Sequence, residues 1–116
     1  METTVLVVDD HPGFRRCARR LLEAHGYQVV GEAADGATAL REAHELRPRL
    51  ALVDVYLPDF SGFEVAERLV AIDPAMAVVL ISSHDPAELK PVGAATGARG
   101  FIPKELLSRE AIEEFL

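Results

Sequence analysis

The 116-residue sequence predicts one α/β domain, with a parallel five-stranded sheet covered by helices on both faces in three layers. Short apolar segments without strict alternation, at residues 4–8, 50–54 and 77–81, are typical of strands buried on both faces of a parallel sheet. Segments with helical spacing of apolar residues separate the strands. The connections are short, which favours right-handed crossovers in a doubly wound fold.

The first strand and helix occupy residues 4 to about 25. β-branched and apolar residues from Thr4 to Val8 predict the strand. The helix opens at His11-Pro12, because proline suits a first helical turn, and Gly26 is a fitting stop. The predicted apolar stripe of this helix consists of Phe14, Ala18, Leu21 and Leu22.

The next units follow the same pattern. Residues 27–33 predict the second strand, and Asp35 caps a helix that runs to about Arg47, before Pro48. The third strand, 50–54, ends in Asp54. Ser61 then caps the third helix and Glu64 completes a capping box, so that this helix continues to the Asp73-Pro74 break.

The last third of the chain contains two more strands. Residues 77–81 form the fourth, which ends at Ser82-Ser83, and residues 99–102 form the fifth. A fourth helix starts near Pro86, and the internal Pro91 predicts a short, kinked or mobile element. Ser108 caps the last helix, with Leu107 and Ile112 spaced as a hydrophobic staple.

Composition excludes several classes of protein. With 49% apolar and 27% charged residues, the chain is neither disordered nor collagen-like. No apolar run is long enough to span a membrane, and the first strand begins too early to leave room for a signal peptide. The net charge of −7 argues against non-specific binding of nucleic acid.

Two features of the first helix have structural as well as functional interpretations. The single Cys17 cannot form an internal disulfide, which fits a reducing cytoplasm, and its spacing from Phe14 and Leu21 predicts a buried, inert thiol. Four arginines lie off the apolar stripe and form either a solvated face or a docking surface for an acidic or helical partner. They are Arg15, Arg16, Arg19 and Arg20.

Polar residues follow four of the predicted strands, namely Asp9-Asp10, Asp54, Ser82 and Lys104. Because the carboxyl ends of parallel strands meet at one edge of the sheet, these side chains are expected to lie together. Crowded carboxylates repel one another, and a divalent cation removes that conflict. The all-oxygen set favours Mg²⁺ over a transition metal, and no His or Cys is found at the spacing of zinc ligands.

The same group of residues suggests phosphoryl chemistry. Asp54 is a candidate nucleophile, because carboxylates can form aspartyl-phosphates. Ser82 can donate a hydrogen bond to a phosphoryl oxygen, and Lys104 supplies a compact positive charge beside it. Each residue also has a plain structural interpretation, as a turn acid, a strand end or a solvated lysine, but their joint occurrence at four strand ends favours a site.

These motifs resemble the receiver domain of two-component response regulators over essentially the whole chain, residues 1–116. The matching stretches are VVDDHP, LVDVYLPDFSG around Asp54, VLISS and GFIPK. The resemblance implies a flavodoxin-like (CheY-like) sheet with strand order 2-1-3-4-5. It also implies a signalling switch and not a multiple-turnover enzyme.

The resemblance assigns a role to each matching residue. Asp54 would accept a phosphoryl group from a phosphohistidine on a sensor histidine kinase or phosphotransfer protein. Ser82 and Phe101 would act as switch residues, with Lys104 as the cation of the site. Mg²⁺ would bind directly to Asp54 and Asp10, through water to Asp9, and to the backbone carbonyl of Tyr56. Tyr56 and His84 occupy positions that tune dephosphorylation in the family.

The stretches DDHP, VVGEAADG and AATGARGFIPKE are most similar to regulators with a C-terminal LuxR/NarL-type helix-turn-helix domain. The resemblance therefore implies transcriptional output and a longer natural polypeptide, which would contact DNA only through that further domain, although a stand-alone receiver stays open. A cytoplasmic protein that forms a homodimer on phosphorylation is expected, with no membrane partner. The first and last helices and the surface around the fourth are the candidate dimer faces.

Two other functions remain as alternatives. A Mg²⁺-dependent phosphohydrolase also uses an Asp nucleophile, but commonly has a second Asp two residues later, where this chain has Tyr56. A flavodoxin-like cofactor carrier needs a Ser/Thr/Gly-rich phosphate loop after the first strand. Here Asp9-Asp10-His11-Pro12 would repel a phosphate.

Overall fold

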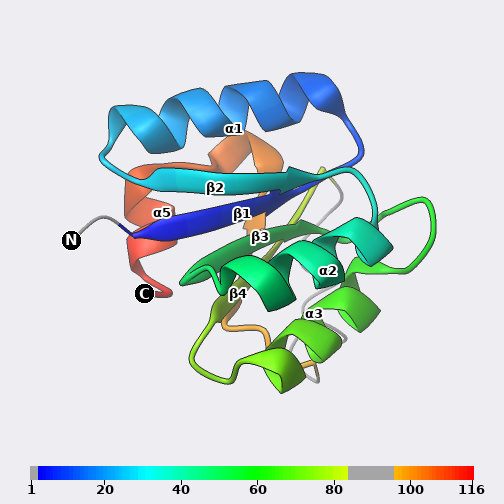
Figure 1. The fold of residues 1–116 in the computed structure, drawn as a ribbon. Coiled ribbons are helices and arrows are strands. Elements are labelled where there is room, and N and C mark those ends of the chain that lie inside the picture. The colour runs from blue at the N-terminus through cyan, green and yellow to red at the C-terminus, as the bar shows by residue number, and fades with distance from the viewer. Residues whose placement is uncertain (1–2, 84–95) are drawn as a thin grey trace.

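The computed structural model describes residues 3–83 and 96–116. Its sheet has five parallel strands in the order β2-β1-β3-β4-β5, which confirms the predicted architecture (Figure 1). The strands are β1 (Thr4–Val8), β2 (Gln28–Ala33), β3 (Leu50–Asp54), β4 (Ala77–Ser82) and β5 (Gly100–Pro103). The predicted fourth helix, with Pro86 and Pro91, lies outside the described residues.

Helices cover both faces of the sheet, as Figure 1 shows. α1 (Pro12–Ala24) and α5 (Arg109–Glu113) pack on one face, and α2 (Gly36–Leu46) and α3 (Gly62–Ile72) pack on the other. A 3₁₀ turn, η1 (Lys104–Leu106), links β5 to α5. In the part of the chain that the structure describes, no helix has the length and hydrophobicity needed to cross a bilayer.

The core has two halves because successive residues of a strand point to opposite faces. In β1, Val5 and Val7 pack against α1 and α5, whereas Leu6 and Val8 pack against α2 and α3. All four are fully buried. Burial on both faces explains why the strand sequences are continuously apolar. The same packing on both faces holds the carboxyl ends of the strands at one edge of the sheet.

The predicted helix caps form as expected. Asp35, Ser61 and Ser108 are the N-caps of α2, α3 and α5, and each side chain accepts a hydrogen bond from the backbone N–H three residues later. The capping box forms only in part, because the Glu64 carboxylate accepts a hydrogen bond from Arg68, one helical turn further along α3. The last helix spans five residues after its cap.

The prediction that Cys17 is buried was wrong, because its side chain is exposed. The centre of the buried stripe on α1 is formed by Ala18 and Leu22, whereas Phe14 and Leu21 are only partly buried at its borders. Spacing from those two border residues therefore places Cys17 beside the stripe and not within it.

Candidate functional site

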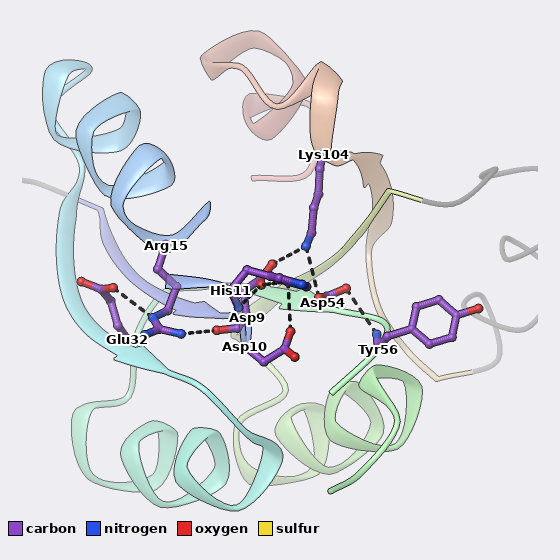
Figure 2. A network of polar contacts seen from close by, with 8 residues as sticks. All are labelled: Asp9, Asp10, His11, Arg15, Glu32, Asp54, Tyr56 and Lys104. Atoms are coloured by element: carbon purple, nitrogen blue, oxygen red, sulfur yellow. Dashed lines mark hydrogen bonds and ion pairs between the residues drawn. The ribbon is translucent and has the colours of Figure 1, made fainter. Parts of the chain in front are cut away.

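The predicted polar residues gather at the carboxyl edge of the sheet (Figure 2). Asp9 directly follows β1, and Asp54 is the last residue of β3, which pairs with β1. Ser82 ends β4, opposite Pro103 of β5, and Lys104 comes next in the chain. Asp9, Asp54 and Ser82 are all buried. The charged groups of Asp9, Asp54 and Lys104, which come from distant parts of the sequence, are thus held together with little access to water.

Lys104 bridges the two buried carboxylates. Its Nζ atom lies 2.7 Å from Asp9 Oδ2 as an ion pair, and it donates a hydrogen bond of 3.2 Å to Asp54 Oδ2. The same ammonium lies 4.7 Å from the centroid of the Phe14 ring at the start of α1, within range of a cation–π contact. The Lys104 side chain is 15% exposed, so these contacts replace most of its hydration.

The electrostatics of the site are strongly coupled. Burial raises the pKa of Asp54 above its ordinary value, the Asp9 carboxylate raises it further, and the contact with Lys104 only partly opposes them. Burial alone would lower the pKa of Lys104, but the carboxylates of Asp9 and Asp54 outweigh it and raise that pKa. The site therefore holds more negative charge than Lys104 neutralises, which is an arrangement that favours an additional cation.

A divalent cation fits the donor set at this edge. Ligand atoms of Asp9, Asp10, His11 and Asp54 all lie within 4.8 Å of one another. The three carboxylates supply the oxygen ligands that Mg²⁺ prefers. The backbone of Tyr56 also turns toward the site, where its N–H donates a 3.3 Å hydrogen bond to Asp54 Oδ1.

His11 belongs to this group as well, although no His or Cys occurs at the spacing of zinc ligands in the sequence. Its backbone N–H donates to Asp9 Oδ1 at 2.8 Å. Its ring Nδ1 lies 3.0 Å from Asp9 Oδ1 and 3.1 Å from Asp10 Oδ1. A spacing rule for zinc sites looks for pairs of His or Cys, so it does not detect one histidine beside two acids.

Arg15 contacts the backbone of the site, so the solvated face that was one of the two interpretations of the α1 arginines does not include this residue. Its guanidinium donates a hydrogen bond to the backbone carbonyl of Asp9 and lies 3.3 Å from Glu32 on β2. Arg19 also pairs with Glu32, at 2.7 Å. Arg15 is only 18% exposed, whereas Arg16 and Arg20 are exposed. The ion pair between Arg15 and Glu32 therefore connects the segment that contains Asp9 and Asp10 to the edge strand β2.

The loop that follows Asp54 is held by a residue that sequence reasoning missed. The Asp59 carboxylate accepts hydrogen bonds from the backbone N–H groups of Gly36, at 2.7 Å, and Ala37, at 2.9 Å, in the first turn of α2. It also accepts one from Phe60 N–H, at 2.8 Å. Burial tends to raise the pKa of Asp59, but these three donors outweigh it and lower that pKa.

We expect Asp59→Asn to lower the free energy of unfolding at pH 7, because an amide group cannot replace a carboxylate that accepts from three N–H groups. A lowered folded-state pKa means that this contribution is present above the ordinary value of 3.8 and is lost as the pH falls through the folded-state pKa. Urea unfolding should therefore show a gap between the wild type and the variant that closes in acid. A gap that is unchanged at low pH would contradict the assignment.

The remaining predicted residues have varied surroundings. Ser82 is buried at the edge, and Phe101 is partly buried against the core on the α2 and α3 side of the sheet. The Tyr56 ring is 52% exposed and points away from the carboxylates in Figure 2. His84 lies outside the described residues. The switch and tuning roles of these residues stay predictions.

The sign of the pKa shift at Asp54 leads to a second expectation. Because its pKa is raised, protonation of Asp54 contributes stability that is fully present below the ordinary value of 3.8 and lost as the pH rises through the folded-state pKa. Asp54→Asn should thus be more stable than the wild type at pH 7 in metal-free buffer, with an advantage that shrinks toward pH 4. Urea titrations across this range test it. Glu67→Gln, which removes an exposed carboxylate of α3 away from the site, serves as the control.

Comparison with known proteins identifies the family of this chain. A family model of the response regulator receiver domain matches residues 5–115. The chain belongs to the response regulator receiver domains. Among solved structures, the signal receiver domain of the response regulator NarL from Mycobacterium tuberculosis is 35% identical, with a TM-score of 0.88 over 97% of this chain and 92% of that one. Chemotaxis protein CheY4 of Vibrio cholerae is 28% identical, with a TM-score of 0.89 over the whole of both chains.

Several curated relatives of this receiver domain are named as regulators of transcription. A protein described as a transcriptional regulator of Pseudomonas aeruginosa is 39% identical over 112 residues, which cover 97% of this chain and 52% of that protein. The virulence transcription regulator BvgA of Bordetella pertussis is 33% identical over 112 residues, or 97% of this chain and 54% of BvgA. The chain thus spans about half the length of these relatives.

Proposed function

We propose that this receiver domain is a phosphorylation-controlled switch in which Asp54 accepts a phosphoryl group with the help of Mg²⁺. The observation that carries the proposal is the contact of the partly buried Lys104 with the buried carboxylates of Asp9 and Asp54 at the carboxyl edge of the sheet. The family membership supports it, because receiver domains take phosphoryl groups from phosphohistidines. The donor is therefore a sensor histidine kinase or a phosphotransfer protein.

In the proposed step, an Asp54 carboxylate oxygen attacks the phosphorus atom, the phosphorus–nitrogen bond breaks, and the imidazole leaves with a proton in place of the phosphoryl group. Lys104 is already within hydrogen-bonding distance of Asp54 and can follow the negative charge onto the phosphoryl oxygens. Asp9, Asp10, Asp54 and the Tyr56 carbonyl would hold Mg²⁺. The metal supplies further stabilisation of that charge.

Phosphorylation would act on the rest of the molecule through Ser82 and Phe101. The added phosphoryl group brings charge and acceptor oxygens to a buried edge. The Ser82 hydroxyl, at the end of the neighbouring strand, would donate to one of those oxygens. Phe101, which is partly buried, would turn inward in response and change the surface that a partner contacts.

The proposed output is control of transcription. It is supported by relatives that are named transcriptional regulators and that are about twice as long as this chain. Contact with DNA would then require a domain beyond the one described, and phosphorylation would promote a homodimer. A cytoplasmic location fits the single, unpaired cysteine.

The test is to label the protein with a small phosphodonor, acetyl phosphate, and to follow the intact mass. We expect one phosphoryl adduct that requires Mg²⁺, and its complete loss in Asp54→Asn. Glu67→Gln, which removes an exposed carboxylate on α3, should label like the wild type. Undiminished labelling of Asp54→Asn would overturn the proposal, and sustained turnover of phosphomonoesters would favour a phosphohydrolase.

A further inference from the structure

We propose that His11 is a nitrogen ligand of the metal site, so that this chain binds divalent transition cations such as Co²⁺, Ni²⁺ or Zn²⁺ through His11 Nδ1 together with the carboxylates. The proposal rests on the metal site of the proposed function, but not on phosphoryl transfer. It concerns the choice of cation, which the three carboxylates alone would leave to Mg²⁺.

The local backbone directs the His11 ring toward the acids. β1 ends at Val8, and the Asp9 carboxylate accepts the His11 N–H at 2.8 Å, which folds the chain back on itself. Pro12 then begins α1 with a restricted backbone angle. The ring of His11 therefore lies beside the carboxylates of Asp9 and Asp10, as Figure 2 shows, and its side chain is 68% exposed.

The distances match those between neighbouring ligands of a metal ion. In an octahedral site with bonds of about 2.1 Å, adjacent ligand atoms are about 3.0 Å apart. His11 Nδ1 is 3.0 Å from Asp9 Oδ1 and 3.1 Å from Asp10 Oδ1. The ligand atoms of these three residues and Asp54 lie within 4.8 Å of one another, which is compatible with coordination of one ion by His11 and the carboxylates.

The two carboxylate oxygens of Asp9 have different partners. Lys104 pairs with Asp9 Oδ2, whereas His11 contacts Asp9 Oδ1. His11 Nδ1 is within hydrogen-bonding distance of Asp9 Oδ1 and lies beside Asp10 Oδ1, so the ring is already positioned next to both carboxylates. The imidazole is thus preorganised for coordination, which lowers the cost of ordering it on binding.

Imidazole changes selectivity because it is a good ligand for Co²⁺, Ni²⁺ and Zn²⁺, whereas Mg²⁺ prefers oxygen. We expect His11→Asn to weaken Co²⁺ binding at least about tenfold and to change Mg²⁺ binding by less than about threefold, as measured by calorimetry. The variant should fold, because asparagine is a favoured residue at the N-cap position that His11 occupies.

A spectroscopic measurement tests coordination directly. The Co²⁺-loaded wild type should show a strongly shifted, exchangeable imidazole N–H proton resonance, which His11→Asn loses and His44→Asn, a change at an exposed histidine of α2, retains. Persistence of the resonance in His11→Asn, or an equal loss of Co²⁺ and Mg²⁺ affinity, would overturn the inference. Failure of the wild type to bind Mg²⁺ at all would instead count against the proposed function.

Discussion

Replacing Lys104 by methionine is expected to lower the free energy of unfolding by about 3 kcal/mol at pH 7 in metal-free buffer. The change removes the ammonium that lies 2.7 Å from Asp9 Oδ2 and 3.2 Å from Asp54 Oδ2, and it leaves two buried carboxylates facing each other. The pKa of Asp54, already raised by burial and by Asp9, should rise further. Urea unfolding of both proteins gives the comparison.

Two controls make this result specific. Arg16→Met removes an exposed cation from α1 and should change stability by less than about 0.5 kcal/mol. Excess Mg²⁺ should restore part of the loss in Lys104→Met, because a cation that binds only the folded state stabilises it. A loss that is small and insensitive to Mg²⁺ would show that the ammonium does not hold the carboxylates together.

The pH dependence of the same difference has a defined sign. The pKa of Lys104 is raised above 10.5, so its contribution to stability is fully present below that pH and is lost as the pH rises through the folded-state pKa. The gap between the wild type and Lys104→Met should therefore be constant from about pH 8 to pH 10 and shrink above that range.

Gly62→Ala is expected to be the second severe change, with a loss of about 3 kcal/mol. Gly62 begins α3 and returns against the end of β3, where its N–H donates to the Val55 carbonyl at 2.7 Å. An added methyl group would collide with the Asp54 carbonyl oxygen and would lie 2.6 Å from Val55 Cα. These are backbone atoms of the site itself, so relief requires movement of the strand that ends in Asp54.

The matched control is Gly13→Ala in α1. An added methyl group there meets nothing within 4 Å, and alanine is favoured over glycine in a helix. We expect this variant to be as stable as the wild type or more stable. If Gly62→Ala changes the free energy of unfolding no more than Gly13→Ala does, the loop after β3 can move aside without loss of stability, which would contradict this prediction.

Periodicity predicted the order of the described strands and helices, but their ends depended on contacts. The second strand begins at Gln28 and not at Tyr27, because the Tyr27 N–H still bonds to the Leu22 carbonyl in the turn that ends α1. The fifth strand shifts by one residue, to Gly100–Pro103, because Pro103 pairs with Ser82. A hydrophobic pattern shows where a strand is buried, but not which residue pairs first.

Three members of the site were missed for a related reason. His11 and Arg15 were assigned by what each residue commonly does at the start of a helix, and Asp59 stood in a turn beside Pro58. In the structure, the His11 ring turns back onto the two acids that precede it, and Arg15 contacts the Asp9 carbonyl and Glu32 on β2. Asp59 contacts the first turn of α2. Local residue preferences carry no information about such partners.

Local patterns were enough to predict the parallel sheet and the charged residues at its carboxyl edge, because buried strands and strand-end acids can be recognised in short stretches of residues. The identity of the contacting atoms depends on the folded arrangement. That arrangement sets Lys104 against Asp54, 50 residues away, and Asp59 against Gly36, 23 residues away. Those contacts depend on how the helices and strands pack on the sheet. Their energies come from burial and from charges that lie within about 3 Å of each other. Neither the packing nor these distances can be deduced from short stretches of the sequence.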